Sequence, residues 1–256
     1  MRTFIIGDVH GCYNTFLKLL EDISFNKLKD SLFCAGDLID RGKYSLDIID
    51  YFYNKYNYAK SVRGNHDDKY LRYLKGNKVQ LSEKDGNYGS HYDNSDFKEE
   101  NIEFFESLPL VLHPTENTTV VHAGFYPWQN HLAFPETFDK KKKACMYIRH
   151  IQNNMKLVDS GGKNVTEEIN NKNMFFDESL PMWYDLYKEQ EYGGTVFFGH
   201  QPMKEPLIVE GKTRIIGLDT GACFDNKLTV FCLEENNFYS VNTLKEDLDK
   251  RSIREL

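Results

Sequence analysis

The chain has 256 residues and a formal net charge of −7, and this length is enough to bury one full hydrophobic core. Hydrophobic residues make up 40% and charged residues 28%, a composition typical of a globular protein and unlike that of a disordered one. No apolar stretch reaches the roughly 20 residues that a membrane span requires, so we expect no membrane partner. The acidic charge also disfavours a protein that wraps a nucleic acid backbone.

The cysteines and the N-terminus indicate the cellular compartment in which the protein is expected to function. The five cysteines are scattered and none forms a C-x-x-C pair, which argues against a zinc knuckle and against a redox pair. Met1-Arg2 leads directly into a strand-like run, without the apolar segment of a cleavable signal. We therefore expect a reducing, cytoplasmic environment.

The first quarter of the chain alternates strands with helices. Short apolar runs from Thr3 to Ile6 and from Ser31 to Ala35 predict buried strands, and a third strand is expected before Gly64. Two amphipathic helices separate them, with apolar positions at Phe16, Leu19, Leu20 and Ile23 in the first and at Leu46, Ile49 and Tyr53 in the second. This order predicts a βαβαβ unit with parallel strands.

Two more helices and a second group of strands follow. The helices are predicted from about Asp68 to Leu74 and from Lys98 to Ser107, with a surface loop over 76–96 between them. The remaining strands are predicted at Thr118–Val121, Thr195–Phe198, Arg214–Leu218, Lys227–Leu233 and Phe238–Val241. We interpret the strands after 194 as a meander that closes a second sheet, followed from Leu244 by a charged helical tail.

The stretch from about 134 to 194 differs in character from the rest, because it contains polar breakers and a run of lysines. We interpret it as an insertion of helices and loops that covers a cleft and influences the choice of substrate. The chain contains no repeat and no clear linker, so we expect a single domain over 1–256.

Five short motifs carry the chemistry, and four of them follow directly after a predicted strand. They are Gly7-Asp8-Val9-His10-Gly11, Gly36-Asp37-Leu38-Ile39-Asp40-Arg41-Gly42, Gly64-Asn65-His66-Asp67, His122-Ala123-Gly124 and Gly199-His200. A buried strand that ends in glycine and a polar residue brings that side chain to the carboxyl edge of a sheet, where α/β proteins bind ligands. Each motif alone is a common turn, but the five in this order predict one shared site.

The residue types in these motifs suit two metal ions. Asp8 and His10 are two residues apart and can hold one ion, while the two oxygens of Asp37 can bridge both ions. The second ion takes its other ligands from Asn65, His122 and His200. Paired ions about 3.5–4 Å apart with a bridging water are a standard device for attack on phosphorus. Oxygen and imidazole ligands without thiolate favour first-row metals, Mn²⁺ first, with Fe, Zn, Mg and Ni as alternatives.

His66 and Asp40 remain for proton transfer. His66 follows the predicted ligand Asn65, and Asp40 lies three residues after Asp37. A carboxylate that orients a histidine and favours its protonation makes it a competent proton donor to a leaving alkoxide.

Two arginines are expected to hold the phosphate. Arg41 follows Asp40 and offers a planar guanidinium that matches phosphate oxygens. The opposite wall of the cleft should supply a second arginine, for which we choose Arg149 ahead of Arg214 and Arg72.

With these motifs the chain resembles the calcineurin-like metallophosphoesterases, and within them the phosphoprotein phosphatase branch of phage and bacterial Ser/Thr protein phosphatases. The resemblance extends from Thr3 to about Val241, apart from the longer stretch at 150–193. It implies a four-layer α/β/β/α sandwich of two mixed β-sheets flanked by helices, with the dimetal site at the strand ends. It also implies the metal, proton-donor and phosphate-binding roles assigned above.

Differences between this sequence and the usual motifs of the superfamily help to assign the chain to one of its branches. The last motif reads Gly199-His200-Gln201-Pro202, where phosphodiesterases and nucleases usually have Gly-His-x-His with a second histidine, and together with Arg41 this favours a phosphomonoesterase. The first motif and the segment Leu218-Asp219-Thr220-Gly221 also resemble the symmetrical diadenosine tetraphosphatases, which typically lack an acid at the position of Asp40. The run Asp68-Lys69-Tyr70-Leu71-Arg72 resembles polynucleotide-end phosphatase domains.

The expected function is therefore a dimetal phosphomonoesterase that attacks with a metal-bridging hydroxide. The main prediction is a Ser/Thr or dual-specificity protein phosphatase, with phosphorylated proteins or small phosphoesters as partners. The alternative is a diadenosine tetraphosphatase-like nucleotide hydrolase or a polynucleotide-end phosphatase that uses the same site. The complete ligand set with His66 and Asp40 argues against a binding module without activity.

Overall fold

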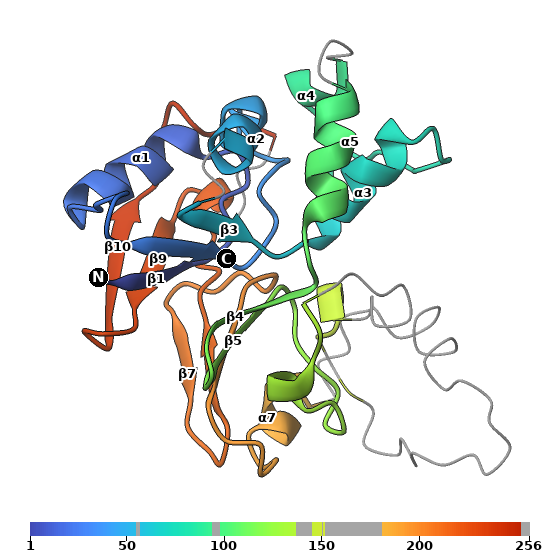
Figure 1. Cartoon of the computed structure of the whole chain (residues 1–256). Helices are drawn as coiled ribbons and strands as arrows, with labels where there is room; N and C mark the ends of the chain where they lie inside the picture. The colour runs from blue at the N-terminus through green and yellow to red at the C-terminus, as the bar shows by residue number, and fades with distance from the viewer. Residues whose placement is uncertain (55–56, 94–97, 137–144, 150, 152–180, 252–256) are drawn as a thin grey trace, which may run out of the picture.

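Two five-stranded sheets form the centre of the molecule (Figure 1). The computed structural model describes residues 1–54, 57–93, 98–136, 145–149, 151 and 181–251. The first sheet has the order β10-β9-β1-β2-β3, with β1 (Thr3–Ile6), β2 (Ser31–Cys34), β3 (Ala59–Ser61), β9 (Lys227–Cys232) and β10 (Asn237–Asn242). The second has the order β4-β5-β6-β8-β7, with β4 (Val111–Thr115), β5 (Thr118–Val121), β6 (Thr195–Phe198), β7 (Leu207–Val209) and β8 (Arg214–Gly217).

Each sheet contains three adjacent parallel strands, which end at one edge of the first sheet (β3) and lie at the centre of the second sheet between two antiparallel edge strands. β1 pairs with β2 and β2 with β3 in parallel, which confirms the predicted βαβαβ unit. β5, β6 and β8 are likewise parallel, whereas β9, β10, β4 and β7 are antiparallel to their neighbours. Both sheets are therefore mixed, as the family resemblance implied.

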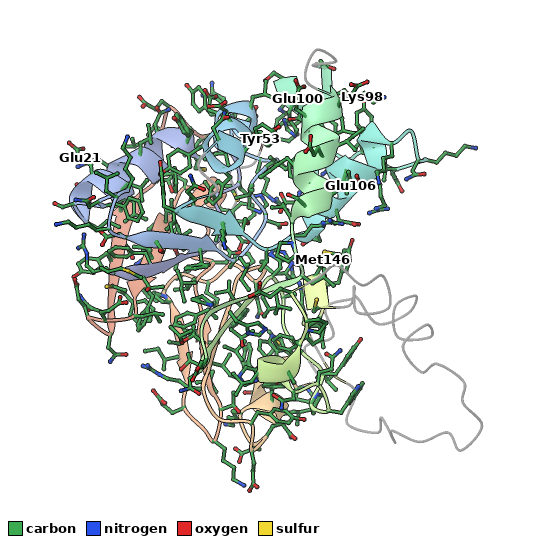
Figure 2. The ribbon with its side chains drawn as sticks, viewed as in Figure 1. Glu21, Tyr53, Lys98, Glu100, Glu106 and Met146 are labelled. Carbon is green, nitrogen blue, oxygen red and sulfur yellow. The ribbon has the colours of Figure 1, made fainter. Side chains whose placement is uncertain are left out.

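Helices cover the outer faces of the sheets (Figure 1). They are α1 (Tyr13–Asp22), α2 (Ser45–Asn54), α3 (Asn65–Leu74), α4 (Ser90–Asp93), α5 (Lys98–Ser107) and α7 (Trp183–Tyr187), with 3₁₀ turns η1 (His131–Ala133) and η3 (Ala222–Phe224). α1 and α2 lie over the first sheet, α3 packs on α5, and α7 lies against the second sheet. Charged side chains on the outer faces, such as Glu21, point away from the molecule (Figure 2).

Three hydrophobic clusters correspond to the three interfaces of this four-layer α/β/β/α sandwich. Side chains alternate between the faces of a strand, so that Phe4 and Ile6 of β1 pack under the helices while Ile5 points toward the second sheet. Similarly, Phe197 of β6 lies between the sheets, whereas Phe198 packs against the cluster of α7. The sheets thus bury both faces, which explains why their strands read as continuous apolar runs.

The predicted meander at the C-terminal end is wrong. β6 and β8 are parallel neighbours in the second sheet, but β9 and β10 cross to the first sheet, where β9 pairs antiparallel with β1. An apolar run has the same period whichever sheet it joins, so the pattern did not distinguish the two. The predicted helical tail is also wrong over 244–251, which forms turns and a β-bridge between Leu248 and Gly42.

Other predictions differ in detail. α3 begins at Asn65, three residues before the predicted start, and α4 forms one turn inside the predicted loop over 76–96. Most of the predicted insertion at 134–194 lies outside the described residues, so its role as a cover and the single-domain prediction remain expectations. No helix among the described residues is long and apolar enough to cross a membrane.

Candidate active site

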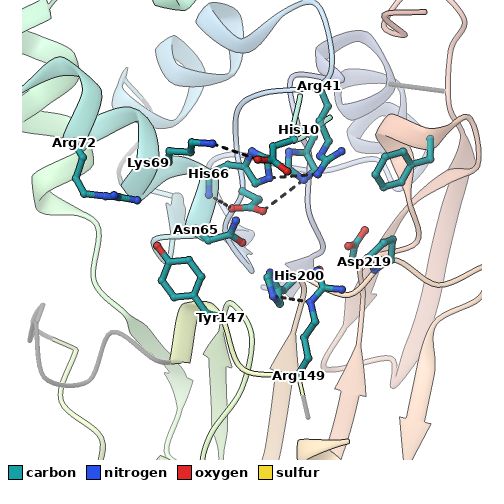
Figure 3. A pocket seen from close by; sticks show the side chains of 14 residues that line it. His10, Arg41, Asn65, His66, Lys69, Arg72, Tyr147, Arg149, His200 and Asp219 are labelled. Atoms are coloured by element: carbon teal, nitrogen blue, oxygen red, sulfur yellow. Dashed lines mark hydrogen bonds and ion pairs between the residues drawn. The ribbon is translucent and has the colours of Figure 1, made fainter. Parts of the chain in front are cut away.

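The carboxyl ends of the six parallel strands meet at one cleft of about 440 Å³ (Figure 3). From the first sheet, the segments that follow β1, β2 and β3 carry Asp8, His10, Asp37, Asn65 and His66. From the second sheet, the segments that follow β5, β6 and β8 carry His122, His200 and Asp219. The side chains of the five motifs are thus brought to a single site by strands from both sheets.

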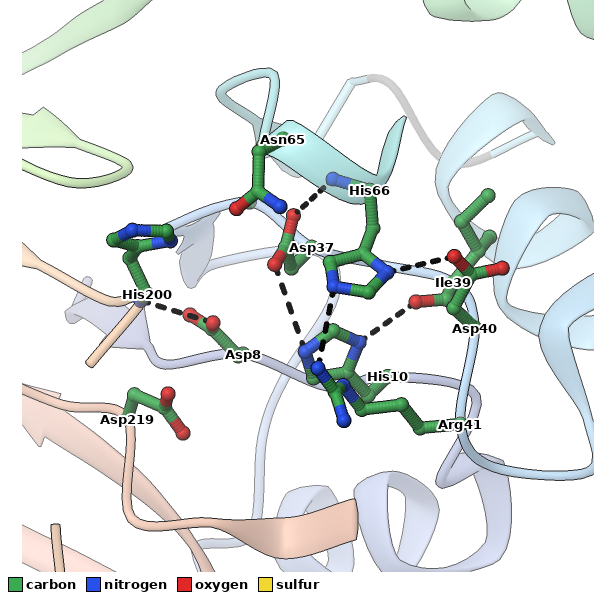
Figure 4. Close-up of polar contacts among 12 residues, drawn as sticks. Asp8, His10, Asp37, Ile39, Asp40, Arg41, Asn65, His66, His200 and Asp219 are labelled. Carbon is green, nitrogen blue, oxygen red and sulfur yellow. Dashed lines mark hydrogen bonds and ion pairs between the residues drawn. The ribbon is translucent and has the colours of Figure 1, made fainter. Parts of the chain in front are cut away.

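Asp37 lies at the centre of the predicted metal ligands (Figure 4). Its Oδ2 is 3.5 Å from Nε2 of His10 and 3.4 Å from Nε2 of His122. His122 Nε2 also lies 3.0 Å from Oδ1 of Asn65. Two groups, His10–Asp37–His66 and Asp37–His122–His200, each bring their possible ligand atoms within 4.8 Å of one another, and Asp37 belongs to both. This is the arrangement expected for two neighbouring ions with one shared carboxylate.

Backbone carbonyls orient the two imidazoles beside Asp37. His10 Nδ1 donates to the carbonyl of Ile39 at 2.7 Å, and His122 Nδ1 donates to the carbonyl of Ala35 at 2.8 Å. In each ring Nδ1 therefore carries a proton and Nε2 faces Asp37. Burial acts to lower the pKa of His122, but the charge and hydrogen bond of Asp37 outweigh it and raise this pKa above its usual value. Hydrogen bonding of the second ring nitrogen is the usual support for a metal-binding histidine. Burial lowers the pKa of His10 to about 3, so this ring is neutral and able to bind an ion at neutral pH.

His200 is oriented from the opposite wall. Arg149 donates from Nε to His200 Nε2 at 3.1 Å and from Nη2 to the His200 carbonyl, also at 3.1 Å. Nδ1 of His200 is therefore the ring nitrogen available to an ion. Burial and the positive charge of Arg149 hold the pKa of His200 well below its usual range, so this ring is also neutral.

Buried negative charge makes the site suitable for cations. One oxygen of Asp8 accepts a hydrogen bond from the backbone N–H of His200 at 2.9 Å, while its Oδ1 is buried without a partner among the described residues. Burial and the nearby charges of Asp219 and Asp37 raise the pKa of Asp8 well above its usual range. An orphaned carboxylate oxygen and three crowded carboxylates are costly unless cations neutralise them. The residues present therefore fit the two divalent ions predicted from the sequence.

The turns that carry these side chains are conformationally strained. Eight non-glycine residues among those described have positive φ, and five of them are predicted site residues: His10, Asp37, Asp40, Arg41 and His200. Such backbone costs of the order of 1–3 kcal/mol each and is held in place only by surrounding contacts. Here His10 N–H donates to the Asp37 carbonyl at 2.9 Å and Gly42 N–H to the His10 carbonyl at 2.9 Å, so the first two motifs hold each other.

His66 and Asp40 are paired, as predicted. His66 Nδ1 lies 2.6 Å from Oδ2 of Asp40, which is completely buried. Burial acts to raise the pKa of Asp40, but hydrogen bonds from His66 and His91 outweigh it and the pKa lies far below its usual range. Asp40 is therefore a permanent carboxylate. The other ring nitrogen of His66 lies 3.5 Å from Nη2 of Arg41, and a guanidinium beside it disfavours a metal ion there.

Asp40 has further partners that the motifs did not reveal. Its Oδ1 lies 2.9 Å from Nε2 of His91, and its Oδ2 accepts hydrogen bonds from Asn87 at 2.6 Å and from Tyr92 at 3.3 Å. These donors come from the loop and short helix around α4, about 50 residues along the chain. No sequence pattern connected them to Asp40.

The two predicted phosphate-binding arginines line opposite walls of the cleft (Figure 3). The guanidinium of Arg41 lies over the ring of Phe224, 4.9 Å from its centroid, and Arg149 is held by His200. Arg72 also lines the cleft, whereas Arg214 pairs with Glu210 and is not among its lining residues.

Asp219, Lys69 and Tyr147 are among the other lining residues, and none of them was predicted as a site residue. Asp219 follows β8 and is buried, and burial together with the charge of Asp37 raises its pKa to about 6. Lys69 projects from α3, and Tyr147 lies in the described part of the predicted insertion. Asp219 could have been found from its position after an apolar run, as the other strand-end residues were.

The comparisons with known proteins agree with this geometry. A family model for calcineurin-like phosphoesterases matches residues 1–233. The chain belongs to this family. The superfamily predicted from the motifs is therefore confirmed, as is the expectation of a metal-dependent phosphoesterase site.

Named relatives of this calcineurin-like phosphoesterase include two kinds of nucleotide hydrolase. It is 30% identical to the bis(5'-nucleosyl)-tetraphosphatase PrpE (asymmetrical) of Oceanobacillus iheyensis, over 94% of this chain and 92% of the relative. It is 25% identical to the symmetrical bis(5'-nucleosyl)-tetraphosphatase of Aliivibrio fischeri, over 96% of this chain and 100% of the relative. A crystal structure provisionally assigned as a diadenosine tetraphosphatase superposes with a TM-score of 0.66 at 22% identity, covering 95% of this chain and 94% of the other.

These relatives support the alternative prediction better than the main one. The similarity extends over nearly the whole length of proteins named as tetraphosphatases, whereas the main prediction placed the chain in the protein phosphatase branch. The solved structure, at 22% identity, supports the fold of this calcineurin-like phosphoesterase.

Proposed function

We propose that this protein is a metal-dependent hydrolase of dinucleoside polyphosphates, which cleaves a phosphoanhydride bond of a bis(5'-nucleosyl) tetraphosphate. The observation that carries the proposal is the similarity, over more than 90% of both chains, to tetraphosphatases of the asymmetrical and symmetrical kinds. A match of this extent covers all the strand-end motifs and the segments between them. The cleft supports it because arginines stand on both sides of the metal-binding groups, as an anionic substrate requires.

Two divalent ions are proposed to be held by Asp8 and His10 on one side and by Asn65, His122 and His200 on the other, with Asp37 between them. When bound, such ions activate a water molecule and stabilise the charge that develops on phosphorus. The neutral imidazoles and carboxylates favour a first-row ion, and we propose Mn²⁺. The metal identity is tested by restoring activity to chelator-treated protein with single ions.

The remaining residues bind the phosphate and move a proton. Arg41 and Arg149 are proposed to bind the non-bridging oxygens of the phosphate that is attacked. Because Asp40 holds the Nδ1 proton of His66, the proton available for transfer lies on Nε2, which faces the cleft. His66 is proposed to donate this proton to the leaving oxygen as its bond to phosphorus breaks.

One observation favours a second candidate function, the phosphomonoesterase expected from the sequence. The buried Asp40–His66 pair, with its 2.6 Å contact, suits protonation of a poor leaving group such as a serine or threonine alkoxide. A nucleotide phosphate is a better leaving group and needs less help from an acid. Activity on phosphoserine and phosphothreonine peptides, or on small phosphoesters, is therefore the competing proposal.

A substrate panel separates the two candidates. The protein with added Mn²⁺ is assayed on diadenosine tetraphosphate, on phosphoserine and phosphothreonine peptides, and on oligonucleotides with 5'- or 3'-phosphate ends. We expect kcat/KM for diadenosine tetraphosphate to exceed that for the peptides by at least tenfold, about 1.4 kcal/mol in transition-state binding. The nucleotide products identify which anhydride bond is cleaved. A peptide or an oligonucleotide that exceeds diadenosine tetraphosphate by the same factor overturns the proposal.

A further inference from the structure

A second hollow opens beside the active-site cleft and is lined mainly by positive charges. It has a volume of about 430 Å³ and shares Lys69, Arg72 and Asp85 with the cleft. Its other lining residues are Lys78, Val79, Gln80, Ser82 and Lys84. Four cations and one anion therefore surround this hollow, although the chain as a whole has a net charge of −7. These positively charged side chains lie together at one end of the active site.

Helix α3 connects this hollow to the chemistry. His66, Lys69 and Arg72 follow one another at intervals of three residues, so they lie on neighbouring turns of one helix face. The rise of an α-helix places Arg72 about 9 Å along the axis from His66. Figure 3 shows Lys69 and Arg72 extending from His66 along the rim, away from His200 and Arg149. A chain of linked phosphates can follow this distance, whereas a single phosphate cannot.

The side chains of α3 are held toward the cleft by neighbours. Arg72 Nε donates to Oδ2 of Asp68 at 2.9 Å, and the same oxygen accepts a hydrogen bond from Tyr147 at 3.3 Å. The ammonium of Lys69 donates to Oδ1 of Asn87 and lies 3.5 Å from Oδ2 of the exposed Asp85. Asn87 is also a partner of Asp40, so the position of Lys69 is linked to the proton-donor pair.

We propose that Lys69 and Arg72, extended by the exposed Lys78 and Lys84, form a subsite for the distal phosphates of a polyphosphate substrate. This inference rests on the proposed function and adds the residues that distinguish a polyphosphate from a monoester. The phosphate that is attacked lies between Arg41 and Arg149, and the phosphates beyond it bind along α3. A phosphoester with one phosphate does not reach this subsite.

The test compares substrates and inhibitors across matched variants. Lys69→Gln/Arg72→Gln removes the two inner cations and Lys78→Gln/Lys84→Gln the two exposed ones. Lys75→Gln is the control, because it removes one positive charge at the end of α3, where Lys75 is exposed, pairs with Glu106 and does not line either hollow. Each variant is assayed on diadenosine tetraphosphate and p-nitrophenyl phosphate. Inhibition of p-nitrophenyl phosphate hydrolysis by inorganic tripolyphosphate and by orthophosphate is measured with Mn²⁺ in excess, and melting temperatures verify folding.

We expect Lys69→Gln/Arg72→Gln to lower kcat/KM for diadenosine tetraphosphate at least about tenfold more than for p-nitrophenyl phosphate, mainly through KM. The inhibition constant of tripolyphosphate should rise by a similar factor relative to that of orthophosphate. The Lys78→Gln/Lys84→Gln variant should change the ratio of the two kcat/KM values and the ratio of the two inhibition constants in the same direction, but by a smaller factor. Lys75→Gln should change neither ratio. Chelation of Mn²⁺ by tripolyphosphate is the same for all variants, so it cancels in these comparisons.

Two outcomes overturn the subsite: equal losses on both substrates, or unchanged selectivity for tripolyphosphate over orthophosphate. The proposed function can fail separately. If the wild type does not hydrolyse diadenosine tetraphosphate but the inner cations still determine tripolyphosphate selectivity, the subsite stands and the substrate is a different polyphosphate.

Discussion

At the scale of single residues, two histidines from different sheets have the same environment. His10 and His122 each use Nδ1 to bond a backbone carbonyl of the segment after β2, and each points Nε2 at Asp37. The carboxylate between them is therefore within reach of both ions. Its removal should affect both sites, while removal of either histidine should affect one.

We predict that Asp37→Asn is the most damaging single ligand change. The amide has no negative charge and cannot bridge two cations, so metal content measured by elemental analysis should fall below two ions per chain and activity should be lost. Asp225→Asn is a matched control, because Asp225 also has positive φ, 66° against 50° for Asp37, and asparagine tolerates this conformation. Asp225 pairs with Lys245 and is not among the residues that line the cleft, so metal content should not change. Full activity of verified metal-free wild-type protein would refute the metal mechanism itself.

We predict that His66→Asn lowers kcat by about 10²–10⁴-fold, the usual contribution of a general acid. Metal content should be retained, since His66 is not one of the proposed metal ligands. The loss should be smaller for p-nitrophenyl phosphate, whose leaving group needs little protonation, than for an alkyl phosphate. Steady-state kinetics on both substrates provide the measurement, and an equal loss on the two would exclude the proton-donor role.

At the scale of elements, the turn after each parallel strand determines where its proposed metal ligand points. Glycines in these turns allow the carboxylate of one motif to lie close to the backbone of another. A Cβ at Gly199 would lie 1.9 Å from Oδ1 of Asp8, and one at Gly64 would lie 2.0 Å from Oδ1 of Asp37. Neither side chain can move far, because both are buried against the opposite sheet or α3.

Gly199→Ala should therefore displace Asp8 and weaken the first ion site. We expect metal affinity, measured by titration of the metal-free protein, to fall by at least about tenfold, with a smaller change in melting temperature. Gly76→Ala is the comparison, because a Cβ there meets nothing within 4 Å. Its positive φ of 72° makes the alanine strained by about 1 kcal/mol, but metal affinity should be unchanged. Equal metal affinity in the two variants would show that Asp8 is not a ligand or can relocate.

At the scale of the whole molecule, the C-terminal segment secures the helix behind the site. Cys12 at the start of α1 provides no side-chain cap, and Asp247 takes this role from more than 230 residues away. The completely buried carboxylate accepts hydrogen bonds from the backbone N–H of Asn14 at 3.1 Å and of Thr15 at 2.6 Å, and from both side chains. Leu248 then bridges to Gly42, directly beside Arg41.

We predict that Asp247→Ala lowers the free energy of unfolding by about 2 kcal/mol or more, since a helix cap and several buried hydrogen bonds are lost together. Denaturant titration provides the measurement. Glu246→Ala removes the same charge at the neighbouring exposed position and should change stability by less than about 0.5 kcal/mol. If the two variants are equally stable, the C-terminal segment does not secure α1.

The sequence by itself determined the strands that end in a motif and the candidate metal ligands that follow them. β1, β5 and β6 have their predicted bounds, because an apolar run followed by glycine and a polar residue is a local signal. The candidate ligands from Asp8 to His200 lie close together because parallel strands end at the same edge.

Tertiary structure decided what depends on contacts between distant residues. These are the sheet that β9 joins, the support of Asp40 by His91 and Asn87, and the cap that Asp247 places on α1. The periodicity of an apolar run is the same in either sheet, and a buried aspartate has the same sequence signature as one in a surface turn. The packing of the layers determines which hydrogen-bond donors surround a buried aspartate. Because a buried charge without partners is costly, the folded structure is one in which these donors reach the carboxylate.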